Sequence, residues 1–357
     1  MKDSKLTELR TQIDQTDKQI VALLDKRAAI AMQIGAAKNN GVVYRPAREV
    51  EVLKNAANTS NGDMPKTSLS IIYKEIIAAC RNLQSPLSVS YLGPEGTYCE
   101  EAARLHCGQS SHYKSATTID ATIELAEKGL VDIAVLPLEN STEGSVTRTL
   151  DLLQKTSLKI CGEIVLPIHH QLLGKVTKKE NITSVIAHPQ ALAQCRNWLA
   201  NNLPKAVLIT ATSNGEAARQ ASISPNTAAI ASTRAADIYD LQIVSKNIED
   251  EPTNTTRFIV LGQNESAATG NDKTSLICTV PNKPGALQNA LSILAVHNIN
   301  MTKLESRPSR SGPWEYLFYI DIDGHQTDTN IKKALNALSE QTISVKITGS
   351  YPKGAQL

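Results

Sequence analysis

The fold is decided by the stretch Asp250-Glu251-Pro252-Thr253-Asn254-Thr255-Thr256-Arg257-Phe258-Ile259-Val260-Leu261-Gly262, in which a polar loop runs directly into a short apolar strand. Thr255, Thr256 and Arg257 lie at the junction, where a rigid sheet edge can project side chains toward a ligand. Hydroxyl groups at such a junction are also common in plain turns, where they only satisfy backbone groups. The residues of the rest of the chain are needed to distinguish a ligand-binding sheet edge from a plain turn. A helical unit and a two-part α/β unit precede the stretch, and one compact module follows it.

Composition and charge exclude several classes of protein. The 357 residues suffice for two or three domains with real cores. A net charge of +2 and an aromatic fraction of 4% offer neither a basic nor a stacking surface for nucleic acid. No apolar run approaches the roughly 18 residues of a membrane span, and the N-terminus is too polar for a secretory signal. We therefore expect a cytoplasmic protein with no nucleic-acid or membrane partner.

The cysteines bear on redox state and metal binding. None forms a Cys-x-x-Cys pair or lies beside a plausible set of histidine ligands. We therefore expect reduced thiols in a cytosolic protein, and neither a metal nor another cofactor. The six residues are Cys80, Cys99, Cys107, Cys161, Cys195 and Cys278.

The N-terminal segment carries a sustained apolar seam at three- and four-residue steps, which predicts one helix from about Lys5 to Lys38. At 1.5 Å per residue this helix is about 51 Å long. Residues 1–86 cannot cover a helix of that length, so we expect a partner chain to cover its far half in an intertwined homodimer. The seam consists of Leu6, Leu9, Ile13, Ile20, Leu23, Ile30, Ile34 and Ala37.

Cations interrupt this seam. Arg27 occupies the seam position itself, and Arg10 and Lys38 share the neighbouring heptad position. Three cations at a buried interface are costly unless an anion is present. Internal salt bridges, with Asp17 or Glu49 for example, are one explanation, and a pocket for a small polyanion is the other.

Two further helices complete the first unit. One is predicted from Pro46, which suits a first helical turn, and it carries Arg48 and Glu49. The other is predicted from Lys66 to Gln84 and puts Cys80 on the same face as its last residue.

These three helices and their basic residues resemble the all-helical chorismate mutase domain. The resemblance implies a cationic clamp around the carboxylates and ether oxygen of chorismate, with Arg10 reaching in from the second subunit. Arg45 and Cys80 depart from the family, where many members have Asp and Ser, and this leaves the detail of the substrate contacts open. The residues implied to be catalytic are Arg27, Lys38 and Gln84, and those implied to bind substrate are Arg10, Arg48, Glu49 and Cys80.

Short apolar strands alternate with helices in the second unit, residues 87–263, which indicates an α/β fold with largely parallel strands. Long connections near Glu163–His170 and Asn247–Asn254 suggest that the chain crosses twice between two lobes. Ligands in such folds bind beyond the carboxyl ends of the strands, between the lobes. The expected strands include Val89–Leu92, Ile133–Leu136, Val185–Ala187, Val207–Ile209 and Ala228–Ala231.

Polar loops follow several of these strands. Gly93–Tyr98 precedes a helix and suits an anion, although an ordinary tight turn is the more common use of such a loop. Histidines near the crossings and loops are more often structural than catalytic. We therefore expect no histidine base among His169, His170 and His188.

The loops, in this order and ending in Thr256-Arg257-Phe258, resemble the prephenate dehydratase domain. Its two lobes resemble type II periplasmic binding proteins. The motifs that carry the resemblance are Thr-Arg-Phe and the Glu-Asn-Ser-x-x-Gly that begins at Glu139. It implies that Thr256 is essential for catalysis. The residues expected to contact substrate are Thr97, Asn140, Ser141, Ser213, Asn214, Arg257 and Phe258.

A polar linker, Gln263–Asn271, leads to the last unit, residues 272–357. The order βαββαβ predicts a ferredoxin-like fold, with a hairpin at Ser309–Pro313. Two short motifs here resemble the effector motifs of the ACT domain in phenylalanine-regulated enzymes, although such residues are also common in plain structure. The expected effector contacts are Gly285, Ala286, Leu287, Glu305, Ser306, Arg307 and Pro308.

The three resemblances together imply a bifunctional enzyme of phenylalanine biosynthesis. It would convert chorismate to prephenate, and prephenate to phenylpyruvate with loss of carbon dioxide and water, under feedback inhibition by phenylalanine. Two alternatives stay open. One is a non-catalytic sensor of phenylalanine or an aromatic acid, against which the clustered cations and the intact Thr-Arg-Phe argue. The other is a dehydratase that has lost the mutase activity through Arg45.

Overall fold

A computed structural model describes residues 2–37, 44–176, 178–308 and 316–354 of the chain. It divides into two compact units, residues 1–87 with 107–112, and residues 88–106 with 113–357. Each unit is described by itself. Two sequence predictions, Lys38 and the hairpin at Ser309–Pro313, lie outside the described residues.

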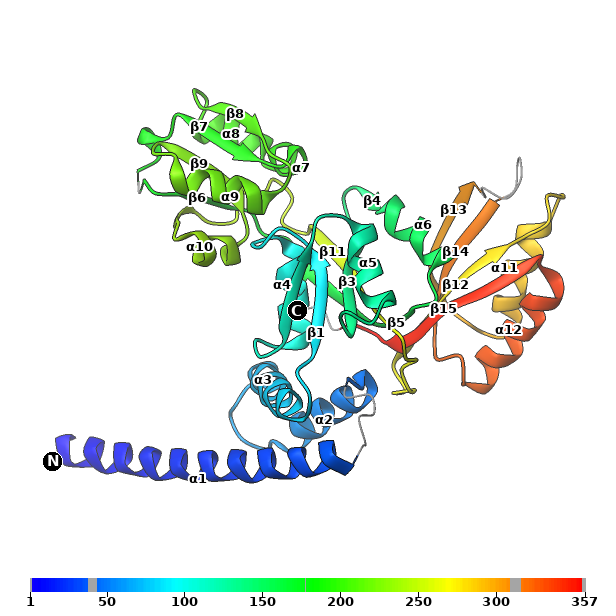
Figure 1. Ribbon diagram of the computed structural model, residues 1–357, viewed down its shortest axis with the longest axis horizontal. Helices are drawn as coiled ribbons and strands as arrows, with labels where there is room; N and C mark the ends of the chain where they lie inside the picture. Colours follow the sequence, from blue (N-terminus) through cyan, green and yellow to red (C-terminus); the bar gives the residue numbers. More distant parts are fainter. Residues whose placement is uncertain (1, 38–43, 177, 309–315, 355–357) are drawn as a thin grey trace. The chain divides into compact units, whose positions relative to one another are not determined.

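The first unit contains one long helix and two shorter ones (Figure 1). The long helix begins at Lys2, slightly earlier than predicted, and its apolar seam is exposed, with 60% of Ile13 and 66% of Leu23 accessible. It packs on the third helix near Gly35, where a Cβ would lie 3.0 Å from the Cβ of Gln84. The helices are α1 (Lys2–Ala37), α2 (Pro46–Thr59) and α3 (Lys66–Gln84).

The first lobe of the second unit, residues 88–106, 113–167 and 255–262, is built on a mixed sheet of order β2-β1-β3-β11-β5, with β4 paired to β3. Strand β11 lies between β3 and β5 and runs antiparallel to both (Figure 1). The prediction of largely parallel strands is wrong here, because the chain re-enters the lobe in the opposite direction. The elements are β1 (Ser88–Leu92), α4 (Tyr98–Cys107), β2 (His112–Ala116), α5 (Ile119–Glu127), β3 (Ile133–Asn140), β4 (Gly144–Ser145), α6 (Thr147–Lys155), β5 (Lys159–Pro167) and β11 (Thr255–Gly262).

The second lobe, residues 168–254, has its own sheet of order β10-β6-β9-β7-β8. Two adjacent segments connect the lobes, as the sequence predicts. The Ile168 amide donates to the Asn254 carbonyl and the Ile248 amide to the His170 carbonyl, both at 2.8 Å. The elements are β6 (Gln171–Gly174), η1 (Lys179–Asn181), β7 (Ser184–Ala187), α7 (Pro189–Gln194), α8 (Arg196–Asn202), β8 (Val207–Thr210), α9 (Asn214–Ile223), β9 (Thr227–Ala231), α10 (Thr233–Tyr239) and β10 (Gln242–Ser245).

The C-terminal module has the predicted βαββαβ order and an antiparallel sheet of order β13-β14-β12-β15. One face of the sheet packs on its two helices, and the other joins the hydrophobic core of the first lobe through Ile277, Leu317, Tyr319 and Tyr351. The module is therefore held to the first lobe by a shared core as well as by the linker. Its elements are β12 (Asp272–Thr279), α11 (Ala286–Val296), β13 (Met301–Pro308), β14 (Tyr316–Asp323), α12 (Thr329–Gln341) and β15 (Ser344–Pro352).

The backbones of the C-terminal module and the first lobe approach each other closely at Gly349. A Cβ there would lie 2.1 Å from the carbonyl oxygen of Ile160 on β5. We expect Gly349→Ala to lower the free energy of unfolding by about 1–3 kcal/mol, as overpacking of a tight contact does. Denaturant unfolding measures this, with Gly62→Ala, a site with open space around it, as the control. Equal stability of the two variants would contradict the close contact.

Candidate active sites

The first candidate site lies where α1 packs on α3. Arg27 is half-buried and its Nη1 donates to the Ile76 carbonyl at 3.5 Å. Gln84 follows on the same side of α3, with its Nε2 directed at the Cys80 carbonyl at 3.5 Å. Its Oε1 is buried and has no hydrogen-bond partner within the described part of the chain. A buried acceptor that lacks a hydrogen-bond partner suits a polar ligand better than a packed core.

Internal salt bridges, one of the two explanations for the cations in the seam, are not observed for Arg27. Among the described residues, no ion pair joins it to Asp17 or to Glu49. Glu49 is instead paired with Arg81, which also donates to the Cys107 carbonyl. Burial raises the pKa of Glu49, although the charge of Arg81 opposes this rise. Glu49 is thus fixed by a buried partner, and its predicted contact with substrate stays a prediction.

Two further basic residues that were predicted to bind substrate, Arg10 and Arg48, are exposed. Arg10 lies 17 positions before Arg27 on one straight helix, about 25 Å away at 1.5 Å per residue. The two cannot meet on one ligand within a single chain. Arg48 pairs with Glu51 at 2.6 Å and borders a groove of about 500 Å³ between α2 and α3, which is also lined by Val52 and Tyr73.

The second candidate site surrounds Thr256 on β11. Thr256 lies opposite Asn140 of β3, whose Nδ2 donates to the Thr256 Oγ1 at 2.9 Å. Ser141 makes two hydrogen bonds with the backbone of Thr255, the residue before Thr256. Its amide donates to the Thr255 carbonyl and its Oγ accepts from the Thr255 amide, each at 2.9 Å. The structure therefore brings Asn140, Ser141 and Thr256 together at one edge of the lobe, and their contacts with substrate stay predictions.

The orientation of the Asn140 amide is fixed by its surroundings. Its Oδ1 accepts from the backbone amides of Thr142 and Glu143, at 3.1 and 3.2 Å. Backbone amides only donate, so the atom they contact must be the oxygen. The nitrogen therefore faces Thr256, whose oxygen accepts that bond. The hydroxyl hydrogen of Thr256 is left available to donate to a ligand.

A hydrogen-bond chain that the sequence did not reveal continues from this pair. Asn140 also donates to the Asn254 Oδ1 at 2.8 Å, and Asn254 donates to the Gln194 Oε1 at 3.3 Å. That oxygen also lies 2.8 Å from the Nε2 of His170, whose Nδ1 lies 2.9 Å from the Tyr98 hydroxyl. The position of Asn254 near the site could have been predicted, because it precedes Thr256 by two residues. Gln194 lies in the second lobe and His170 in the crossing, and neither is close in sequence to a motif of the site.

Other predicted contacts serve local structure. Thr97 accepts from the Glu100 amide near the start of α4, and Ser213 caps α9 by accepting from the Glu216 amide. Asn214 accepts from the His188 amide and so ties two strand-end loops of the second lobe. Their contacts with substrate stay predictions.

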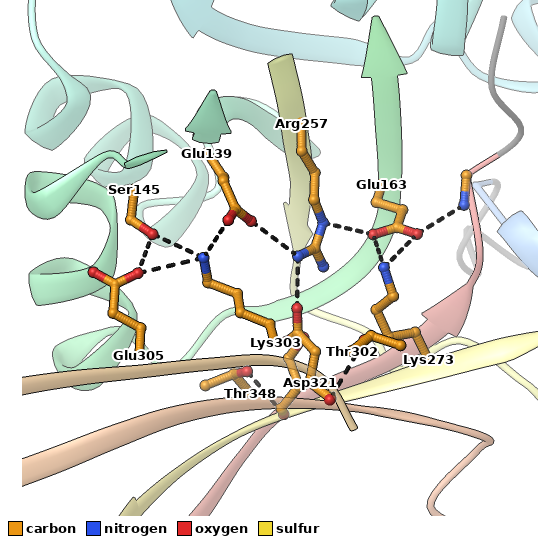
Figure 2. Close-up of polar contacts among 12 residues, drawn as sticks. Glu139, Ser145, Glu163, Arg257, Lys273, Thr302, Lys303, Glu305, Asp321 and Thr348 are labelled. Carbon is orange, nitrogen blue, oxygen red and sulfur yellow. Dashed lines mark hydrogen bonds and ion pairs between the residues drawn. The ribbon is translucent and has the colours of Figure 1, made fainter. Parts of the chain in front are cut away.

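Arg257 points to the opposite side of β11 from Thr256, as alternate residues of a strand do. Figure 2 shows its guanidinium between Glu139 and Glu163 and above Asp321 of the C-terminal module. Its Nε donates to Glu163 at 2.7 Å and its Nη1 to Asp321 at 2.6 Å. Burial alone would lower the pKa of Arg257, but Tyr351 and these carboxylates raise it well above its usual range.

The structure does not support the prediction that Arg257 and Phe258 contact substrate. The guanidinium of Arg257 is taken up by acidic partners, and Phe258 is 2% exposed within the core. A substrate would have to displace ion pairs with three carboxylates, those of Glu139, Glu163 and Asp321, to reach the arginine.

The predicted effector residues separate into two groups. Gly285 is exposed and has a φ of 77°. It precedes α11 as the N-cap residue and gives no side-chain cap, and Ala286 and Leu287 are the first two residues of that helix. On β13, the side chains of Glu305 and Arg307 instead bond to Ser145 and Thr147 of the first lobe. Ser306 and Pro308 alternate with them and are exposed.

Within the described ranges, no group of three or more potential ligand side chains could hold a metal ion. The six thiols are free and buried. No helix in this part of the chain is both long and apolar enough to cross a bilayer.

Three family models match the chain in sequence order. They are chorismate mutase type II over residues 9–85, prephenate dehydratase over residues 89–266 and the ACT domain over residues 274–340.

Relatives and solved structures agree with these matches. A bifunctional chorismate mutase/prephenate dehydratase of Neisseria gonorrhoeae is 48% identical over 98% of both chains, and one of Stutzerimonas stutzeri is 41% identical over 98% of both. A prephenate dehydratase from Arthrobacter aurescens, solved with L-Phe, has a TM-score of 0.69 and 32% identity and covers 74% of this chain and 90% of its own. A protein described as a novel type of quorum quenching acylase has the same TM-score, 29% identity and coverage of 75% and 98%. Fold alone therefore does not decide the activity.

The buried His170 makes the stability of the second unit depend on pH. Burial lowers the pKa of His170 from 6.5, and the nearby His169 lowers it further, whereas Gln194 and Glu249 act to raise it. The Tyr98 hydroxyl contacts the Nδ1 of His170. The unfolded chain takes up a proton as the pH falls through 6.5, whereas the folded protein does so only at lower pH. The contribution of neutral His170 to the free energy of unfolding is therefore fully present above pH 6.5. It is lost as the pH falls below this value, by up to about 1.4 kcal/mol per pH unit.

We expect His170→Gln, which keeps a donor for Gln194, to flatten this part of the profile. The free energy of unfolding, measured against pH below 6.5, tests the expectation. An unchanged slope in the variant would show that other groups cause the acid sensitivity.

Proposed function

This chain belongs to the bifunctional chorismate mutase/prephenate dehydratase family, and we propose that it catalyses both reactions in succession. The first unit rearranges chorismate to prephenate. The first and second lobes convert prephenate to phenylpyruvate, carbon dioxide and water. The available hydroxyl hydrogen of Thr256, set by the donor from Asn140, is the observation that carries the second assignment.

The mutase reaction is a pericyclic rearrangement and needs no nucleophile. The enzyme has to hold a compact conformer of chorismate and stabilise charge on its ether oxygen, which cations and amides can do. Arg27 and Gln84 supply a guanidinium and a side-chain amide on adjoining helices. Arg48 and Lys38 complete the clamp in this proposal, and Cys80 and Glu49 make further contacts with the substrate.

A second copy of the chain supplies Arg10 and makes the enzyme a homodimer. Two observations support this proposal. The apolar seam of α1 is exposed along most of its length, whereas soluble helices normally bury such a stripe. Arg10 is also too far from Arg27 along α1 to share a ligand with it.

In the dehydratase reaction, the carboxylate leaves as carbon dioxide and its bonding electrons pass into the ring. Ring electrons then expel the hydroxyl group, which needs a proton to leave as water. Thr256 donates a hydrogen bond to this group, since Asn140 occupies its acceptor side. Ser141 holds the adjoining backbone, and Thr97, Ser213 and Asn214 are proposed to bind the remainder of prephenate.

In this proposal the enzyme is cytoplasmic. Phenylalanine acts as its feedback inhibitor by binding to the ACT domain. Support comes from the ACT family match and from the L-Phe in the related dehydratase of Arthrobacter aurescens. Gly285 offers an uncrowded helix start whose backbone amides suit a carboxylate. Gly285–Leu287 and the exposed Ser306 and Pro308 are the proposed contacts.

Replacing Arg27 separates the two activities. We expect Arg27→Ala to lower the mutase kcat by about 10²–10³-fold, as loss of one stabilising donor does. Dehydration of added prephenate should persist. Lys26→Ala, an exposed neighbour, is the matched control. A folded Arg27→Ala variant with the mutase rate of this control would disprove the clamp.

Replacing Thr256 should have the converse effect. Thr256→Val keeps the shape and removes the hydroxyl, so we expect a loss of about 10²–10⁴-fold in dehydration of prephenate and an unchanged mutase rate. Thr255→Val is the matched control one residue away, and Thr256→Ser should retain part of the activity. Turnover of prephenate by Thr256→Val at the rate of Thr255→Val would remove Thr256 from the mechanism.

A further inference from the structure

Strand β13 presents two different faces. It is an edge strand of the ACT sheet, so one long side of its backbone has no partner strand among the described residues. Lys303, Glu305 and Arg307 point at the first lobe. Leu304 and Ser306, which alternate with them, are exposed. One strand thus carries both the contact with the dehydratase lobe and part of the proposed phenylalanine surface.

Lys303 makes the most enclosed of these contacts. Its side chain is 9% exposed, and its Nζ lies 2.9 Å from the Glu139 Oε1 and 2.8 Å from the Ser145 Oγ (Figure 2). Glu305 provides a second carboxylate at 3.3 Å. A desolvated ammonium group is stable only with such partners, so the position of Lys303 is tied to both sides of this junction.

The two first-lobe partners of Lys303 lie opposite each other, at the base of one turn. Glu139 is the last residue but one of β3 and Ser145 is the last residue of β4, and the two are register partners. The turn between them begins with Asn140, and the amides inside it fix the Asn140 side chain by donating to its Oδ1. Lys303 bridges the base of the turn that orients Asn140, and Asn140 in turn orients the hydroxyl of Thr256.

We propose that Lys303 is a positioning residue for the dehydratase reaction, and that phenylalanine inhibits by moving it. The regulatory half rests on the proposed binding of phenylalanine to the ACT domain. Lys303 itself does not touch substrate in this proposal. Lys303 bridges the base of the turn that holds Asn140. Phenylalanine bound to the opposite face of β13 moves Lys303 away from Glu139 and Ser145.

The size of the expected effect follows from geometry. A displacement of about 1 Å at a reacting group can cost about 10²-fold in rate. A ligand shifts an equilibrium only by its difference in affinity for the two states, typically a factor of about 5–150. The loss of Lys303 should therefore resemble the inhibited state, with slow turnover and little further response to phenylalanine.

The test uses three variants of the full chain. Lys303→Met keeps the apolar stem and removes the charge, and Lys303→Arg restores a cation. Lys346→Met is the matched control, because Lys346 donates to the carbonyls of Leu153, Gln154 and Thr156 in the same domain contact, away from the turn. The measurements are kcat and KM with added prephenate, the phenylalanine concentration for half-inhibition, phenylalanine binding by calorimetry, and the mutase rate.

For Lys303→Met we expect kcat to fall by up to about 10²-fold, with a smaller change in KM and an unchanged mutase rate. Phenylalanine should still bind, but half-inhibition should need about 5–150-fold more of it. Lys303→Arg should recover part of both properties, and Lys346→Met should keep both.

Parent values of kcat and inhibition in Lys303→Met would overturn the proposal, as would equal losses in Lys346→Met. A parent enzyme that does not respond to phenylalanine would refute the proposed regulation instead. In that case the kcat of Lys303→Met still decides whether Lys303 positions the turn.

Discussion

The alternation of side chains along β11 is the constraint on which the second unit depends. Consecutive residues of a strand face opposite ways, so Thr256 meets Asn140 on one side while Arg257 meets Glu163 and Asp321 on the other. Strand β3 repeats the arrangement beside it, with Asn140 on the first side and Glu139 on the second. The candidate catalytic pair and the contact with the ACT domain are therefore separated by the thickness of one sheet.

This arrangement explains why charge is buried at the domain contact. Arg257, Lys273 and Lys303 lie among Glu139, Glu163 and other carboxylates, with most of the cationic side chains enclosed. Buried ion pairs contribute little net stability over apolar packing, but breaking one leaves an unpaired charge at a cost of about 3–5 kcal/mol. The shared apolar core supplies the affinity between the ACT domain and the first lobe, and the ion pairs fix how the two are aligned. Such a contact favours a few discrete arrangements over continuous sliding.

Much of the fold could be predicted from the sequence, because periodicity is local. The seam of α1, the two crossings and the βαββαβ order all appear where the sequence placed them. The destinations of individual side chains could not be predicted. Arg257 follows Thr256 in one motif, yet only the structure shows that it meets Glu163 of β5 and Asp321 of the ACT domain. Glu305 and Arg307 likewise belong to a predicted effector motif, but the structure directs both to the first lobe.

The ACT domain and the catalytic pair share β3 and β11, and hydrogen exchange with and without phenylalanine measures whether these strands couple the two. We expect phenylalanine to change the exchange of backbone amides in the turn after Asn140 and at Thr255–Arg257, as well as in the ACT domain. A change confined to residues 272–354, in an enzyme that phenylalanine inhibits, would contradict it.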